Sequence, residues 1–240
     1  MSALLRVEGV TAGYLPGIDI LQDVSLQVEA RTVAGLIGLN GAGKSTLMHV
    51  IAGFLPCRRG RVRLDDRDIT GRPPHTMIDH GLWYIPQASS LFPYLSVKDN
   101  LALVVARRRG ATGAGRLEAA LDALPALRAK LSSQAGALSG GQQKMLEFAK
   151  ALVVRPRLCL VDEPTVGLAP RLADEIYTWV EALAREGTSI LLVDHNVQQV
   201  IRMSATVHVM SLGRIAASGD AARFAEDLHG QVRQWLGIAL

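Results

Sequence analysis

Long apolar runs, aromatic side chains and cysteines are all scarce in this sequence of 240 residues. No apolar run approaches the ~18 residues that a membrane-spanning helix needs, so we expect any role at a membrane to depend on a partner. Aromatic residues make up 5% of the chain, which argues against a surface that stacks single-stranded nucleic acid. The two cysteines, Cys57 and Cys159, form neither a disulfide framework nor a zinc pattern, and they predict a reducing compartment.

The strongest pattern present is a phosphate-binding loop of the form G-x-x-x-x-G-K-S. An apolar run over 33–37 predicts a buried strand before it, and residues 47–52 predict a helix after it. Glycines allow the backbone to approach a polyphosphate closely, and the N–H groups at the helix start favour an anion. We expect Lys44 to reach the β- and γ-phosphates and the Ser45 hydroxyl to hold Mg²⁺. The predicted nucleotide-binding residues of the loop are Gly38, Leu39, Asn40, Gly41, Ala42, Gly43, Lys44, Ser45 and Thr46.

Further polar residues follow apolar strand patterns. Asp162 and Glu163 end the run over 158–161; such an acid can hold Mg²⁺ through water, and its neighbour can deprotonate an attacking water. His195 follows the buried run over 189–193, and Gln87 follows Pro86 at the end of the run over 81–85. Ligands of open α/β sheets bind at the carboxyl ends of strands. These positions therefore predict that Gln87 faces a ligand and that His195 contacts a γ-phosphate.

The order of the patterns predicts the fold class. Residues 4–10 and 24–28 read as antiparallel strands, and the block over about 90–155 turns helical, with Ser96 as an N-cap, a break at 110–115 and a helix over 117–131. Ser139 and two glycines precede another helix and form a second potential anion nest. A hairpin across 211–213 and a helix over 220–236 end the chain. We predict an α/β fold with a largely parallel core sheet and an inserted helical subdomain.

Taken together, these motifs resemble the ATP-binding subunits of ABC transporters over nearly the whole chain. The segment Leu138–Gln142 reads LSGGQ, which is the signature motif of that family. The resemblance implies a P-loop NTPase core with an N-terminal antiparallel β-subdomain, and a single ATP-binding domain over 1–240 whose helical signature subdomain covers about 90–155. It makes Gln87 the Q-loop residue and a metal ligand beside Ser45 and Asp162. It makes His195 the switch histidine, so that the catalytic set is Glu163, His195 and Gln87. Tyr14 becomes the aromatic that stacks on adenine, where the residues alone also allow a surface side chain.

The resemblance also implies a mechanism, cofactors and partner proteins for the chain. In this family two domains pair head to tail, and ATP lies between the phosphate loop of one and the signature segment of the other. The second set of nucleotide contacts is then Ser139, Gly140, Gly141 and Gln142. The implied cofactors are ATP and Mg²⁺. The implied partners are a second ATPase subunit, identical or different, membrane permeases and a solute-binding protein; no nucleic acid is expected. The implied location is the cytoplasmic face of the inner membrane, peripheral through these partners.

Within the family, the chain looks most like the importers of branched-chain and other hydrophobic amino acids. The segments that carry this finer likeness are Asp162–Pro170, Asp65–Thr70 and Leu91–Leu101, together with the ending near 235–237. The segments 88–92 and 194–197 also resemble the lipopolysaccharide-export ATPase, and the urea importers of the same branch are a further alternative. A soluble ABC ATPase that moves no solute is the rival from another class, but such proteins usually carry two cassettes or a long coiled coil.

Overall fold

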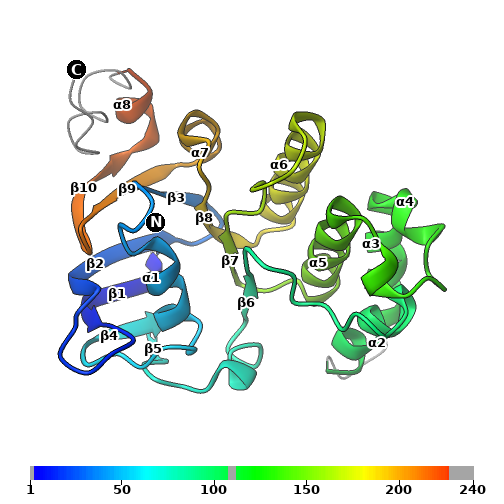
Figure 1. The fold of residues 1–240 in the computed structure, drawn as a ribbon, viewed down its shortest axis with the longest axis horizontal. Helices are drawn as coiled ribbons and strands as arrows, with labels where there is room; N and C mark the ends of the chain where they lie inside the picture. The colour runs from blue at the N-terminus through cyan, green and yellow to red at the C-terminus, as the bar shows by residue number, and fades with distance from the viewer. Residues whose placement is uncertain (1–2, 108–111, 227–240) are drawn as a thin grey trace. The chain divides into compact units, whose positions relative to one another are not determined.

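A computed structural model of the protein describes residues 3–107 and 112–226. The chain forms two compact units (Figure 1). The first comprises Met1–Tyr84, Arg157–Glu163 and Gly187–Leu240, and the second comprises Ile85–Pro156 and Pro164–Glu186. The organisation of residues 1–240 as one ATP-binding domain remains a prediction. None of the helices in the described ranges is both long and apolar enough to cross a membrane.

Two sheets build the first unit, and the predicted fold class is confirmed. The antiparallel sheet has the order β2-β1-β4-β5 and the larger sheet has the order β10-β9-β3-β8-β7-β6. In the larger sheet β3 is parallel to β8 and β9, β7 is parallel to β8, and β10 closes a hairpin with β9. The strands are β1 (Ala3–Ala12), β2 (Leu21–Glu29), β3 (Val33–Ile37), β4 (Arg59–Leu64), β5 (Arg67–Asp68), β6 (Leu82–Ile85), β7 (Leu158–Asp162), β8 (Ser189–Val193), β9 (Thr206–Ser211) and β10 (Arg214–Asp220).

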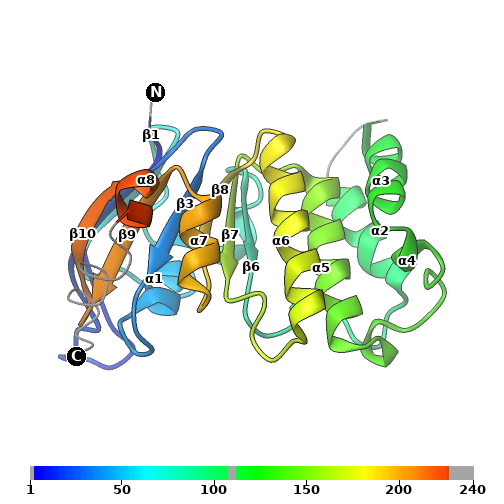
Figure 2. The ribbon, with the colours of Figure 1, turned by 90° about the horizontal axis from the view of Figure 1, so that it is seen from above.

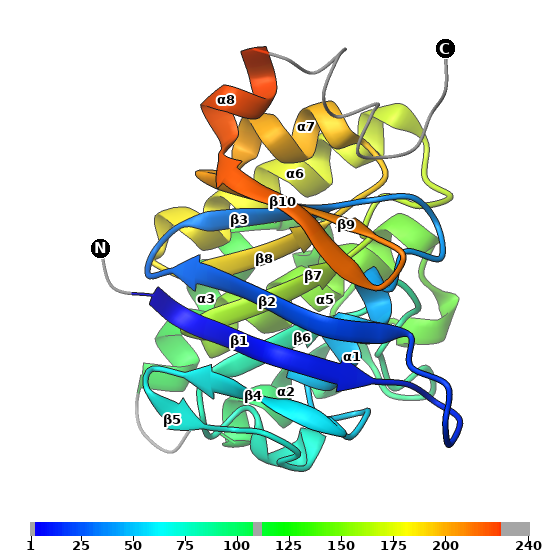
Figure 3. The same cartoon turned by 90° about the vertical axis from the view of Figure 1, so that its left-hand side faces the viewer.

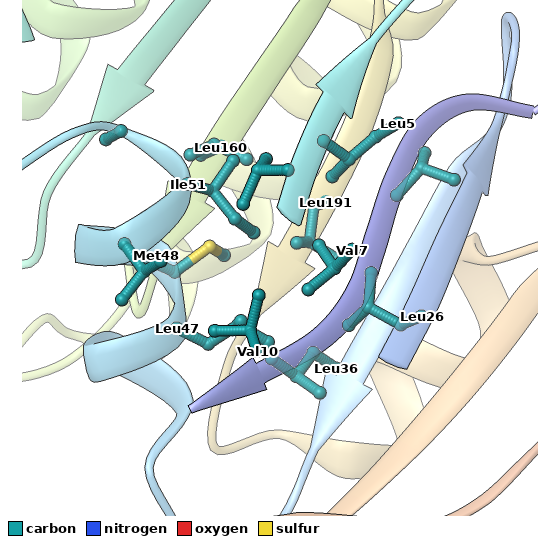
Figure 4. Close-up of a cluster of buried hydrophobic side chains, with 14 of the residues drawn as sticks. Leu5, Val7, Val10, Leu26, Leu36, Leu47, Met48, Ile51, Leu160 and Leu191 are labelled. Carbon is teal, nitrogen blue, oxygen red and sulfur yellow. The ribbon is translucent and has the colours of Figure 1, made fainter. Parts of the chain in front are cut away.

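The core of the first unit lies between the antiparallel sheet, the parallel strands and helix α1 (Lys44–Ile51). Every residue of β3, β7 and β8 is buried, as expected for parallel strands that are covered on both faces. Figure 4 shows Leu47, Met48 and Ile51 of α1 facing side chains from β1 and from the parallel strands. Because β3, β8 and β7 are parallel neighbours, their carboxyl ends lie at one edge of the sheet. That edge carries the phosphate loop, Asp162 and Asp194.

His208 on β9 ties the two sheets of this unit together. Its Nε2–H donates to the carbonyl of Gln27 in β2 over 2.9 Å, and its Nδ1 accepts from the Ser218 hydroxyl in β10 over 2.7 Å. Figure 3 shows β2 and β10 running side by side. Burial lowers the pKa of His208 below its usual value, although the bond to Gln27 opposes this effect. The folded protein therefore keeps this histidine neutral.

This arrangement predicts a pH dependence of stability. The unfolded chain takes up a proton below about pH 6.5, whereas folded His208 resists it, so the free energy of unfolding should fall as the pH drops below that value. The loss from one histidine cannot exceed about 1.4 kcal/mol per pH unit. Urea titrations at about pH 7.5 and about pH 5.5 would measure the loss in the parent and in His208→Asn. Equal losses in both proteins would contradict the assignment.

Helices build the second unit. They are α2 (Val97–Arg107), α3 (Thr112–Ala123), α4 (Pro125–Arg128), α5 (Gly140–Val154) and α6 (Pro170–Arg185), together with the 3₁₀ turn η2 (Ala135–Ala137). Figure 2 shows α5 and α6 side by side, and the Phe148 and Trp179 rings join them with centroids 5.7 Å apart. Ser96 caps α2 by accepting from the Asp99 N–H over 3.0 Å, as predicted.

Two sequence predictions about these helices need correction. The single helix over 117–131 was wrong: α3 ends at Ala123 and α4 begins with Pro125, because proline has no N–H for the helix ladder and keeps the preceding residue out of helical geometry. The break over 110–115 is shorter than predicted, since α3 already begins at Thr112; residues 110 and 111 lie outside the described ranges. In the first unit, the predicted last helix is observed as α8 (Ala221–Glu226), and 227–236 also lie outside those ranges.

Candidate functional site

The phosphate loop joins β3 to α1 and its geometry requires its glycines. A Cβ on Gly38 would lie 2.3 Å from the carbonyl oxygen of Met210, so no other residue fits there. Gly43 precedes α1 and has a φ of 106°, a backbone angle that residues with a Cβ rarely adopt. Lys44 is 6% exposed, and its ammonium donates to the carbonyls of Gly38 and Leu39 over 3.0 and 3.1 Å. The loop therefore holds a buried cation at the start of a helix, where backbone N–H groups favour an anion such as phosphate.

Asp162 lies at the end of β7, beside the phosphate loop. The Ser45 hydroxyl donates to its Oδ1 over 3.3 Å, and the Tyr84 hydroxyl donates to its Oδ2 over 3.1 Å. Burial raises the pKa of Asp162, and the bonds from Tyr84 and Ser45 oppose that rise. Burial and the Asp162 charge raise the pKa of Tyr84, which keeps its hydroxyl protonated as a donor.

Glu163 follows Asp162 in an unusual backbone conformation. Its φ is 43°, a left-handed value that costs energy for a residue with a side chain. Its N–H donates to the carbonyl of Val193 on β8 over 2.8 Å, which holds the turn in place. Its carboxylate lies 3.8 Å from the Lys44 ammonium and the side chain is 16% exposed. The strained turn thus aims the carboxylate toward the phosphate loop.

His195 follows β8 at the same edge of the sheet. Its Nδ1 lies 3.1 Å from Oδ1 of the buried Asp194, which also accepts from the Asn196 N–H over 3.0 Å. The imidazole side chain is 58% exposed. Because Nδ1 faces Asp194, Nε2 is the ring nitrogen that remains to contact a ligand.

Tyr14 lies in the loop between β1 and β2 and is 54% exposed. Its hydroxyl pairs with Nδ1 of His49 over 2.9 Å, and the two rings meet edge to face. His49 lies on α1, one turn after Ser45. The structure therefore brings Tyr14 beside the helix that begins the phosphate site.

The remaining predicted residues belong to the second unit. Ser139 caps α5 in a capping box: its hydroxyl accepts from the Gln142 N–H, and the Gln142 side chain accepts from the Ser139 N–H over 3.1 Å. Gly140 and Gly141 form the first turn of that helix. Gln87 has an exposed side chain, and its carbonyl accepts from the Lys144 ammonium over 2.9 Å.

The donor set of the first unit fits magnesium. Ser45 Oγ and Asp162 Oδ1 are hard oxygen donors, and their separation of 3.3 Å is close to the ~3 Å between neighbouring oxygens around a magnesium ion with ~2.1 Å bonds. Within the described residues no group of three histidine, cysteine or acidic side chains could hold a metal by itself. A magnesium ion here would depend on phosphate oxygens and water for its other ligands, which is its usual mode beside nucleotides.

Several residues that support the site were missed by the sequence analysis. Tyr84 bonds to Asp162, which is 78 residues away in the chain, and His49 bonds to Tyr14, which is 35 residues away. No local sequence pattern marks Tyr84 or His49. In the second unit, Lys144 and Glu147 form a buried ion pair at 2.9 Å; Lys144 also donates to the carbonyl of Pro86, and Glu147 accepts from the Ser90 hydroxyl. The only available signal was a Lys–Glu pair three residues apart on an otherwise apolar helix face.

We expect Tyr84→Phe to weaken magnesium binding about tenfold, because it removes the hydrogen bond that orients Asp162 and leaves the ring in place. Titration of Mn²⁺ into the protein with a non-hydrolysable ATP analogue, followed by electron paramagnetic resonance, would measure the change. Tyr94→Phe is the matched control, because that side chain is 87% exposed. Equal Mn²⁺ affinity in Tyr84→Phe and the parent would exclude this role.

Comparisons with known proteins agree with this geometry. The family model for ABC transporters matches residues 21–166. A probable branched-chain amino acid transport ATP-binding protein, LivF of Archaeoglobus fulgidus, is 37% identical over 93% of this chain and 94% of its own length. BraG of Pseudomonas aeruginosa, a high-affinity branched-chain amino acid transport ATP-binding protein, is 34% identical over 84% and 87%. LptB of Escherichia coli, the lipopolysaccharide export ATP-binding protein, is 32% identical over 98% of both chains.

The fold has counterparts among solved structures. The ADP conformation of an ATP-binding cassette of an ABC transporter superposes with a TM-score of 0.84, at 28% identity and over the full length of both chains. The matched family region includes the phosphate loop, the signature segment and the acidic pair. The chain therefore belongs to the ABC transporter family, as an ATPase subunit that binds and hydrolyses nucleotide.

Proposed function

We propose that this ATPase powers the import of branched-chain or other hydrophobic amino acids through partner permeases, at the cytoplasmic face of the membrane. One structural observation supports the chemistry above all. The phosphate loop, a metal-binding pair and a strained acidic residue meet at one edge of a parallel sheet, with Lys44 and Glu163 3.8 Å apart. The finer assignment to amino acids rests on the relatives named for that transport.

Each residue of this edge has a proposed role in ATP hydrolysis. Lys44 binds and neutralises the phosphoryl oxygens, and Ser45 and Asp162 hold the magnesium ion, which supplies further charge stabilisation when bound. Glu163 accepts a proton from the attacking water through a carboxylate that the backbone already aims at the loop. His195 contacts the terminal phosphate through Nε2, while Asp194 fixes its ring. Gln87 belongs to the second unit, and its proposed role is to report the state of the nucleotide to the permease.

The chain contributes two anion-binding segments to transport, and we propose that they serve different nucleotides. The phosphate loop belongs to the first compact unit, and Ser139–Gln142 belongs to the second. Pairing of two ATPase subunits head to tail places ATP between one chain's loop and the other chain's signature segment. ATP binding then closes the pair and hydrolysis opens it, so that transport follows the differential affinity of two states.

Lipopolysaccharide export is the second candidate function, and the observation that favours it is the 32% identity to LptB over 98% of both chains. The identities to the two amino acid transport subunits are 37% and 34%. The ATPase chemistry is the same in both cases. The two candidates differ in the membrane proteins that bind the chain.

Purification of the tagged chain from detergent-solubilised native membranes tests this proposal. We expect it to retain two hydrophobic permeases, a second ATPase subunit and an amino-acid-binding protein. Recovery of lipopolysaccharide-export components would overturn the import assignment and keep the ATPase. Recovery of ribosomal or DNA-bound proteins without any membrane protein would overturn the transport role as well.

A further inference from the structure

Residues 13–20, between β1 and β2, form a compact loop that displays large apolar side chains; we call it the Tyr14 loop. Tyr14, Leu15 and Ile18 on it are 54%, 61% and 57% exposed. The backbone at Gly13 lies close to the backbone at Ile18, since a Cβ on Gly13 would lie 1.9 Å from the carbonyl oxygen of Ile18. Large apolar side chains that are exposed together on an ordered loop indicate a surface that contacts a ligand or a partner.

One side chain from outside the loop holds its backbone. The Arg58 guanidinium donates to the carbonyls of Ile18 over 2.9 Å and of Gly13 over 3.2 Å, and it also bonds the carbonyl of Leu15 and pairs with Asp19. The backbone of Arg58 is itself bonded to β1, since its backbone N–H donates to the carbonyl of Thr11 over 2.8 Å. A planar guanidinium with five donors suits several acceptors at once, which an ammonium cannot match. Arg58 thus clamps both ends of the loop.

The clamped loop is also tied to the phosphate site. The Tyr14 hydroxyl pairs with His49, and His49 lies on the same helix whose first residue is Lys44. The bond is 2.9 Å long and joins positions 35 residues apart in the chain. The Tyr14 ring therefore has a set place relative to the phosphate loop before any nucleotide binds.

We propose that Arg58 is a positioning residue for recognition of the nucleotide base: it pre-organises the Tyr14 loop so that the aromatic ring can stack on the base. This inference rests on the proposed ATPase function and on the base-stacking role that the family resemblance implies for Tyr14. A loop that is ordered in advance loses less conformational entropy on binding, so Arg58 contributes to affinity without touching the ligand. Its contribution concerns the base alone, because the contacts to the phosphates come from a different loop.

Isothermal titration of the full chain with ATP and with inorganic tripolyphosphate separates the two contributions. Arg58→Gln should weaken ATP binding about three- to tenfold and leave tripolyphosphate binding within about twofold of the parent. Tyr14→Ala should show the same split, because stacking on an aromatic ring supports only the base. The double variant Tyr14→Ala/Arg58→Gln should lose little more than Tyr14→Ala alone, since Arg58 acts through Tyr14. Arg59→Gln, at an exposed neighbouring position, is the matched control.

Two further readouts distinguish positioning from a general loss of structure. In steady-state hydrolysis Arg58→Gln should raise KM for ATP and leave kcat unchanged, and Arg58→Lys should recover part of the affinity. Equal weakening of ATP and tripolyphosphate, or no weakening of either, would overturn the role of Arg58. If Tyr14→Ala binds ATP like the parent, the base platform itself is wrong although nucleotide binding stands. If the parent binds neither ligand, the proposed function fails and the inference fails with it.

Discussion

Replacing Glu163 with glutamine is expected to lower ATP turnover about 100- to 10,000-fold, the range associated with loss of a general base. The glutamine amide has the shape of the carboxylate but cannot accept the proton of an attacking water. The backbone at this position has a φ of 43° and is held by the bond to Val193, and both features should survive a change of one side-chain atom. ATP binding should therefore persist while hydrolysis stops.

Phosphate release and equilibrium binding of ATP should be measured on the same preparation of Glu163→Gln. Glu181→Gln is the matched control, because Glu181 is an exposed acid on α6. We further expect ATP to trap a dimer of the variant, which sedimentation would detect with an ATPase partner present. Hydrolysis by Glu163→Gln at the parental rate would show that another group is the base.

Lys44→Ala should weaken nucleotide binding itself, the step that precedes hydrolysis. A hydrogen bond to a charged group contributes about 1.5–3 kcal/mol, so loss of the ammonium should weaken ATP binding about 10- to 150-fold. Tripolyphosphate binding should fall by a similar factor, because the lost contact is to phosphate. This result would differ from the base-specific loss expected for Arg58→Gln.

Lys44 also has a structural role that the measurement must separate. Its ammonium is bonded to two carbonyls of the phosphate loop and is only 6% exposed, so its removal leaves those carbonyls with fewer donors. Binding should be compared at a temperature well below the unfolding midpoint of the variant, with Lys98→Ala on α2 as an exposed control. Unchanged affinity of folded Lys44→Ala for ATP would exclude the assigned phosphate loop.

Local patterns predicted those parts of the site that depend on neighbours in the chain. The phosphate loop has glycines at fixed spacing between an apolar strand and a helix, and Ser139 precedes its helix with Gln142 in the N3 position, so short-range rules suffice. Asp162 and Glu163 were predicted as site residues because a buried run ends there. The same rules could have predicted the helix break at Pro125. The high alanine and leucine content of 117–131 favoured a single helix instead.

Contacts between distant positions could not be predicted in this way. The bond from Tyr84 to Asp162 joins positions 78 residues apart, and the bond from Arg58 to Ile18 joins positions 40 residues apart. A tyrosine in a strand and an arginine in a surface turn are both ordinary in sequence. Their roles follow only from the fold, which brings β6 beside β7 and sets the turn before β4 against the Tyr14 loop.

Uptake of radiolabelled leucine, isoleucine and valine by cells that carry Glu163→Gln in place of the native chain would test the central claim most directly. The claim is that ATP hydrolysis at this edge of the sheet drives amino acid import. We predict that uptake stops in Glu163→Gln cells and continues in Glu181→Gln cells, with both proteins present at equal amounts. Normal uptake by cells whose Glu163→Gln protein has lost its ATPase activity would contradict it.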